Sequence, residues 1–126
     1  MFEISVEHVF SAAHALAIAG TREPVHGHNW HVTAIIVGDA LDSDELVCDF
    51  HTVHAALEDI TGAFHNRSLN DVAPFTTINP SAERVARHIA DELASRLDAS
   101  LAPHARVRSV RVTEAPGCGA TYIRPR

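Results

Sequence analysis

The sequence is short of cysteine, of positive charge and of long apolar runs, and each shortage excludes a class of protein. Its two cysteines, Cys48 and Cys118, are too few and too far apart for a disulfide framework, so we expect reduced thiols in a cytoplasmic protein. With 10 basic residues against 16 acidic ones, the net charge of −6 argues against nucleic-acid binding. No run approaches the roughly 20 apolar residues that a membrane span needs. The small apolar stretch 11–20 follows Glu3 and Glu7 instead of a basic segment, so we expect no signal peptide.

The length is the next constraint. A chain of 126 residues is typical of one domain, here residues 1–126, which buries about two-thirds of its extended surface. Such a core is modest, and association with other copies would add to it.

Four segments have the pattern of β-strands. Residues 2–10 alternate apolar and polar side chains, the period of a half-buried strand. Residues 30–38 are rich in Val, Ile and Thr, which favour extended chain. Residues 107–114 carry spaced valines in a polar background, and residues 120–123 follow a turn-rich connection. We expect these last two segments to pair as a hairpin.

Two segments have apolar residues at helical spacing. Residues 50–64 follow Asp49, a fitting N-cap. Residues 82–97 carry a continuous apolar stripe, and we expect Asn79 to cap this helix with Pro80 at its first position. The order strand, strand, helix, helix, strand, strand predicts an α+β fold with both helices on one face of a four-stranded antiparallel sheet.

A pair of histidines two residues apart is the strongest chemical signal. In extended chain His26 and His28 project to the same side, and Gly27 between them leaves room for an ion. With His14 as a third ligand, neutral imidazoles would leave a fourth zinc position open for substrate, as in a catalytic site. Because the chain has ten histidines, a His-x-His pair is also typical of an ordinary surface or hydrogen-bonding pair. The spacing alone leaves both interpretations open.

A series of motifs in a fixed order carries a resemblance along nearly the whole chain. The motifs are Phe10-Ser11-Ala12-Ala13-His14, His26-Gly27-His28, Asp49-Phe50, Leu69-Asn70, Asn79-Pro80 with Glu83, and Glu114. In these the chain resembles the 6-pyruvoyltetrahydropterin synthase family, which includes 6-carboxytetrahydropterin synthase. The resemblance implies the tunnelling fold (T-fold), in which trimers close a barrel from three sheets and stack into homohexamers with sites at subunit interfaces.

The resemblance also implies a role for each motif residue. His14, His26 and His28 match the family's three zinc ligands, and Glu114 matches the carboxylate that holds the pterin ring. The implied substrate is 7,8-dihydroneopterin triphosphate or a related pterin. A cation at the substrate's hydroxyls would stabilise the charge that forms when a neighbouring C–H proton leaves.

The catalytic triad of the family is not conserved in its usual places. Arg22 stands where the family has its cysteine base, and Glu23, one residue later, is the replacement that we predict. His65-Asn66 stands where the family has an Asp-His pair, so His65 is a second candidate. Cys118 lies in a turn beyond the pterin-site glutamate and is not expected to act as the base.

Three functions therefore compete. The first is a zinc-dependent lyase that forms 6-carboxytetrahydropterin, on a deazapurine route such as queuosine biosynthesis, or that cleaves the pterin side chain. The second is a homologue that binds a pterin or purine-like ring without the family reaction. The third, a small cupin with a His-x-His metal site, is disfavoured by the helical pattern at 82–97.

Overall fold

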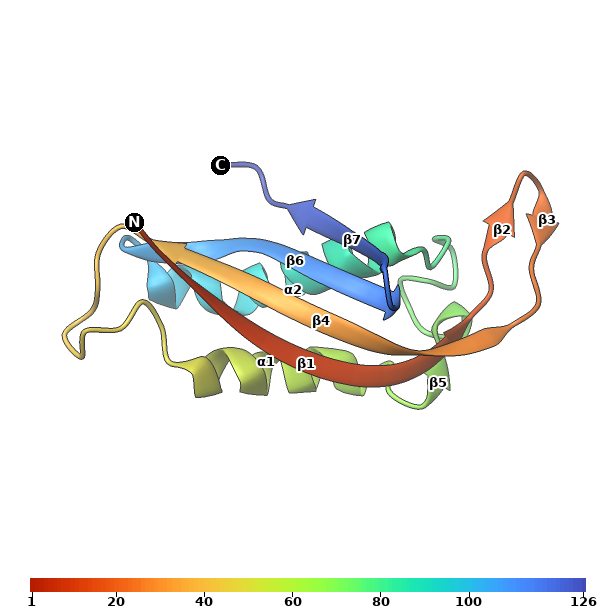
Figure 1. The fold of residues 1–126 in the computed structure, drawn as a ribbon, viewed down its shortest axis with the longest axis horizontal. Helices are drawn as coiled ribbons and strands as arrows, with labels where there is room; N and C mark the ends of the chain where they lie inside the picture. Colours follow the sequence, from red (N-terminus) through yellow and green to blue (C-terminus); the bar gives the residue numbers. More distant parts are fainter.

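The computed structural model describes residues 1–126 and contains one main sheet with two long helices. The long elements are β1 (Phe2–His14), β4 (His26–Gly38), α1 (Phe50–Gly62), α2 (Ala82–Leu101), β6 (Ala105–Ala115) and β7 (Cys118–Ile123). The short ones are β2 (Ala17–Ile18), β3 (Thr21–Arg22), β5 (Arg67–Ser68) and a 3₁₀ turn at Leu69–Asp71. Both helices lie on the same side of the sheet (Figure 1), which confirms the predicted α+β layer arrangement.

The sheet contains the four predicted strands and one that was not predicted. Its order is β5-β1-β4-β6-β7, and the four long strands pair antiparallel with their neighbours. The two-residue strand β5 pairs parallel with Ala12 and Ala13 of β1. It forms because the chain leaving α1 runs along the open edge of β1, where the Asn66 N–H donates to the Ser11 carbonyl at 2.6 Å. Two residues have no alternation that a sequence pattern could reveal.

The strands β1 and β4 are longer than predicted, and their pairing sets the position of the histidine motif. They pair without a break from Phe2 opposite Gly38 to His14 opposite His26. The prediction ended the first strand at Phe10 because residues 11–13 are small and show no contrast between the two faces. In the structure their burial continues to alternate, so His14 lies on the face that the helices cover.

The helix caps agree with the sequence at one helix and differ at the other. Asp49 caps α1 as predicted, because its side chain accepts a hydrogen bond from the His51 N–H at 2.8 Å. The predicted cap of α2 is wrong: Ser81 is the N-cap, and its hydroxyl accepts from the Arg84 N–H at 3.2 Å. The side chain of Asn79 is bound elsewhere, to the backbone of Ala17. Serine is as good a cap as asparagine, so tertiary contacts decide between them.

The core lies between the helices and one face of the sheet. The apolar stripe of α2 is fully buried at Val85, Ile89 and Leu93. Phe10 and Trp30 come from neighbouring strands and stack with ring centroids 5.9 Å apart. This apolar layer continues directly into His14, which is also completely buried. No helix of the structure has both the length and the apolar character needed to cross a membrane.

Candidate metal and substrate site

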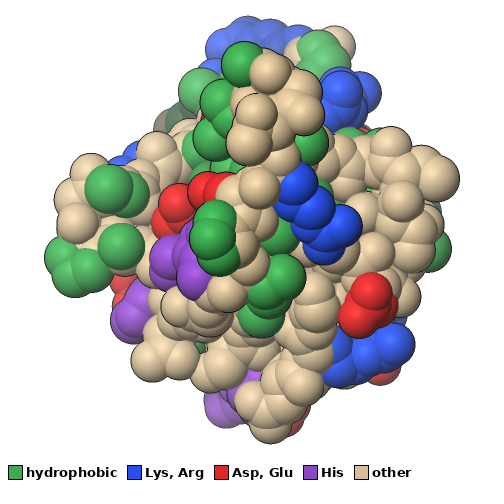
Figure 2. Space-filling model, turned by 90° about the vertical axis from the view of Figure 1, so that its right-hand side faces the viewer, with side chains coloured by type: hydrophobic (Ala, Val, Ile, Leu, Met, Phe, Trp, Pro, Cys, Tyr) green, Lys and Arg blue, Asp and Glu red, His purple; other side chains and the backbone are tan.

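Three predicted ligands meet at one end of the sheet. His14 and His26 are directly opposite each other on β1 and β4, and His28 lies two residues along β4 on the same face. One ligand nitrogen from each ring can be chosen so that all three lie within 4.8 Å of one another. Figure 2 shows histidine and acidic side chains side by side at this end of the molecule. The pairing of β1 with β4 therefore brings His14 next to residues that are 12 and 14 positions away in sequence.

The hydrogen bonds of two rings orient them for ligation. The Nδ1–H of His14 donates to the Pro80 carbonyl at 2.8 Å, and the Nδ1–H of His26 donates to the Pro24 carbonyl at 3.0 Å. Because a carbonyl oxygen only accepts, each Nδ1 carries the hydrogen and each Nε2 presents a lone pair. Such second-shell bonds are typical of metal-binding histidines.

The third ring is held in its neutral form by its surroundings. Burial lowers the pKa of His28 below its ordinary value, an effect opposed by the negative charge of Glu114 and strengthened by His14. A neutral imidazole is the form that ligates a metal. The chemistry of this donor set fits a zinc ion.

Glu114 reaches the same point from the end of β6. Its Oε2 lies 3.4 Å from Nε2 of His14 and 3.9 Å from Nε2 of His28. All three atoms are buried and have no hydrogen-bond partner. Buried polar atoms without a partner are costly, and a bound cation would compensate them.

Asn70, predicted only as a motif residue, and Asn79, predicted also as the cap of the second helix, hold the backbone after His14. Asn70 accepts from the Ala15 N–H and donates to the Ala15 carbonyl, each at 2.9 Å. Asn79 makes the same pair of bonds to Ala17, each at 3.0 Å. The motifs Leu69-Asn70 and Asn79-Pro80 were the signal, but the backbone partners are 55 and 62 residues away in sequence.

Glu23 lies at the rim of the histidine cluster. Its Oε1 is 3.8 Å from Nε2 of His26 and also accepts from the Leu16 N–H at 2.9 Å. The Glu23 N–H donates to the Leu16 carbonyl at 2.9 Å, which closes the short hairpin of β2 and β3. Neither strand of this hairpin was predicted from the sequence, and the hairpin includes Arg22, whose side chain is exposed.

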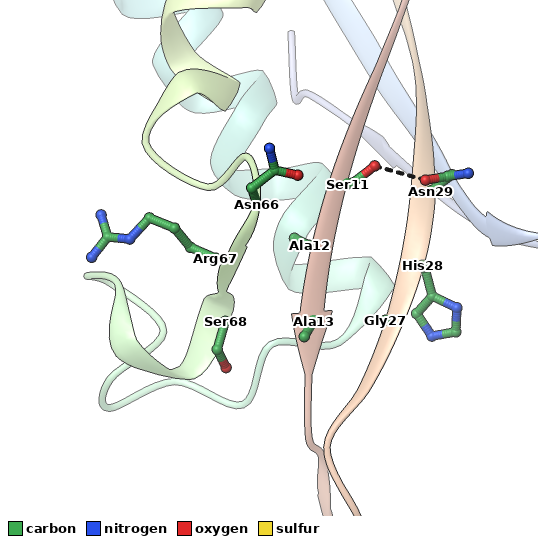
Figure 3. A pocket seen from close by; sticks show the side chains of 9 residues that line it. All are labelled: Ser11, Ala12, Ala13, Gly27, His28, Asn29, Asn66, Arg67 and Ser68. Atoms are coloured by element: carbon green, nitrogen blue, oxygen red, sulfur yellow. Dashed lines mark hydrogen bonds between the residues drawn. The ribbon is translucent and has the colours of Figure 1, made fainter.

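His65 is not part of the cluster. Its Nδ1 accepts from the Ser11 N–H at 3.2 Å, at the edge of β1 next to β5. An open cavity of about 540 Å³ lies beside this edge. Its lining residues are Ser11, Ala12, Ala13, Gly27, His28, Asn29, Asn66, Arg67 and Ser68. The His28 side chain projects away from Asn66, Arg67 and Ser68 (Figure 3). Within one chain, His65 is therefore not among the side chains that could share a metal ion.

The comparisons with known proteins agree in one family. The family model described as 6-pyruvoyl tetrahydropterin synthase matches residues 3–125. The 6-carboxy-5,6,7,8-tetrahydropterin synthase of Bacillus subtilis (strain 168) is 30% identical over 103 residues, covering 77% of this chain and 68% of the relative.

Solved structures give the same result for the fold. The 6-pyruvoyl tetrahydropterin synthase of Caenorhabditis elegans superimposes with a TM-score of 0.80 at 23% identity, covering 99% of this chain and 98% of the other. That of Plasmodium falciparum has a TM-score of 0.80 at 21% identity, covering 98% and 97%. A Plasmodium vivax variant, in which a glutamate described as a catalytic residue is replaced by alanine, has a TM-score of 0.78 at 20% identity, covering 99% and 98%. These likenesses confirm the predicted T-fold for the single subunit.

Proposed function

Since the chain belongs to the 6-pyruvoyl tetrahydropterin synthase family, we propose that it is a zinc-dependent lyase acting on 7,8-dihydroneopterin triphosphate or a closely related pterin. The observation that carries this proposal is the convergence of His14, His26 and His28 on one point, with two of the rings oriented through Nδ1. The Bacillus relative, described as a 6-carboxytetrahydropterin synthase, favours that reaction over cleavage of the side chain.

The three histidines would hold the zinc ion through their Nε2 atoms. Bound there, zinc would supply a Lewis acid that lowers the pKa of a coordinated substrate hydroxyl. The chain contributes a rigid frame for it, because His14 is fully buried and hydrogen-bonded to Pro80.

Glu114 is the residue that we propose for the pterin ring. A carboxylate only accepts, so it suits the adjacent N–H and amino donors of the ring. The side chain keeps 27% of its surface exposed, which allows a ring to approach it from the open end of the site.

Glu23 is our candidate for the base that removes the substrate proton. Its carboxylate lies beside His26, and the Plasmodium vivax enzyme has a glutamate described as a catalytic residue. An ordinary carboxylate, with a pKa of about 4.3, is a weak base near neutral pH, so bound substrate would have to shield it from water.

His65 is the alternative base, and it implies assembly. Because it lies at the β1 edge and outside the cluster of its own chain, it would act on a pterin bound in a neighbouring copy. This fits a homohexamer built as a dimer of trimers, the assembly that we propose.

Cys48 and Cys118 are both free thiols, which fits the cytoplasmic location that we expect.

The test is incubation of zinc-loaded protein with 7,8-dihydroneopterin triphosphate, followed by liquid chromatography and mass spectrometry. We expect a product whose mass identifies the reaction, and its loss in Glu23→Gln with zinc content unchanged. Glu45→Gln, in the exposed loop before α1 and outside every motif of the family, is the matched control and should keep full turnover. Turnover retained in Glu23→Gln would transfer the role of base to His65.

A second function is favoured by one observation. The position of the family's cysteine is Arg22, and the structure brings no thiol to the histidine cluster, since Cys48 is buried before α1 and Cys118 begins β7. A pterin or purine-like ring that binds to the protein but is recovered unchanged would support this non-catalytic alternative.

A further inference from the structure

One cavity of the molecule offers hydrogen-bond donors and contains no carboxylate. It is the open cavity of about 540 Å³ beside the β1 edge, and its volume lies in the range of small-molecule sites. Four other cavities each include at least one Asp or Glu among their lining residues. In a chain with 16 acidic and 10 basic residues, a cavity that has an arginine and no acid is suited to an anion.

Strand pairing and small side chains form this cavity. Two rows of paired residues cross β5, β1 and β4 here, namely Arg67 with Ala12 and His28, and Ser68 with Ala13 and Gly27. A Cβ added at Gly27 would meet no atom within 4 Å, so the glycine leaves open space above the strand. The segment that carries Arg67 therefore forms one wall of the cavity, and the strand that carries His28 forms the opposite wall.

The polar groups of the walls are donors that the chain itself leaves largely unused. The Ser11 hydroxyl donates to Oδ1 of Asn29 at 2.7 Å, which leaves the amide N–H groups of Asn29 for another acceptor (Figure 3). The Ser68 side chain makes no capping bond to the 3₁₀ turn that follows it. Arg67 donates to the Ala63 carbonyl at 3.3 Å, and none of the ion pairs between Arg and Asp or Glu includes it.

The guanidinium of Arg67 lies at the outer rim of the cavity. Its exposed side chain leaves β5 on the side away from His28 (Figure 3), so it is free to fold over a ligand. Arginine presents a planar fork of donors that matches the oxygens of a phosphate group. An apolar ligand would leave these donors without a partner. The donor set therefore favours a ligand with several acceptor oxygens and negative charge.

We propose that this cavity binds the triphosphate of the substrate, with Arg67 as the main contact of the anion. The inference rests on the proposed function, because His28 lines the cavity and also belongs to the histidine cluster that would hold the reacting part of the pterin. The phosphate chain would bind at the β5 wall while the hydroxylated side chain stays at the metal site. Arg67 would then select phosphorylated over unphosphorylated pterins without taking part in the chemical step.

The first experiment tests the cavity without any pterin. The full chain, treated with a chelator so that no metal competes for the anion, is titrated with inorganic triphosphate in a calorimeter. Arg67→Gln should bind the anion at least about tenfold more weakly than wild type, and Arg67→Lys should recover part of the affinity because it keeps the charge. Arg126→Gln removes an arginine from a cavity beside Gly38, at the far end of β4, and should match wild type. Equal affinities of wild type and Arg67→Gln would overturn the inference.

The second experiment uses zinc-loaded protein with 7,8-dihydroneopterin triphosphate and with 7,8-dihydroneopterin. Arg67→Gln should raise the KM for the triphosphate at least about tenfold with kcat unchanged, the pattern of a lost binding contact. Its affinity for 7,8-dihydroneopterin should equal that of wild type. A purely structural role of Arg67 predicts instead that both pterins bind more weakly, and that result would overturn the inference.

The two experiments separate this inference from the proposed function. Turnover with the same KM in wild type and Arg67→Gln would refute the triphosphate site and leave the proposed function intact. A wild-type protein that binds inorganic triphosphate through Arg67 but neither binds nor converts a pterin would support the anion site and refute the proposed function.

Discussion

Asn70→Ala and Asn79→Ala remove the same pair of hydrogen bonds from two places that differ in burial. Asn70 binds the N–H and C=O of Ala15, which is 2% exposed, directly after His14. Asn79 binds the N–H and C=O of Ala17, where both residues are exposed. Water can replace the lost partner only at the second place.

The magnitudes follow from this difference. A buried backbone group that loses its hydrogen-bond partner costs about 1–3 kcal/mol of stability. Asn70→Ala leaves two such groups, partly shielded from water, without a partner, so the free energy of unfolding should fall by about 2–4 kcal/mol. At an exposed position the net value of a hydrogen bond is small, and Asn79→Ala should lose about 1 kcal/mol or less. Against a typical total stability of about 5–15 kcal/mol, the first loss is large.

The assay is urea unfolding of both variants in the presence of a chelator, which removes any contribution of bound metal. Zinc titration of the refolded proteins is the second readout, because displacement of the Ala15 backbone would also move His14. Equal losses in the two variants, or a loss below about 1 kcal/mol in Asn70→Ala, would refute the argument that burial of Ala15 determines the cost.

Two further predictions concern histidines. His28→Ala should weaken zinc binding at least about tenfold in a competition titration, whereas His31→Ala, exposed on β4, should not; equal affinities would contradict the three-histidine site. Burial lowers the pKa of His88, which packs against Phe64 and Phe75 with ring centroids 5.5 Å from each, so the folded state favours its neutral form. The stability from this packing is present above the unfolded pKa of about 6.5 and is lost as pH falls below it. His88→Gln should therefore flatten the decrease of the unfolding midpoint between about pH 7 and pH 5; an unchanged slope would contradict the assignment.

The local elements could be predicted from the sequence because their signals are local. The alternation in residues 2–10 and the apolar stripe of α2 each express one period, and that period is a property of neighbouring residues. The same holds for the Asp49 cap, whose bond reaches only two residues along the chain. The order of the motifs likewise indicated the family from the sequence alone, and the family model matches residues 3–125.

Long-range contacts decided the remainder. Asn79 is of a residue type that often caps helices, but its side chain binds the exposed backbone of Ala17, and Ser81 caps α2 instead. The strand β5 exists only because the edge of β1 offers it partners, and Glu23 faces His26 only because a hairpin closes between them.

The site shows the same division. The motifs identified the side chains of the site, which are His14, His26, His28 and Glu114. This was possible because the functional group of a side chain follows directly from its residue type. Their approach to a few ångströms depends on the β1–β4 register and on the irregular end of β6, which are set by pairing between distant segments. For that reason the sequence by itself determined which groups are present, and only the tertiary structure decided that a buried carboxylate oxygen faces the lone pair of His14.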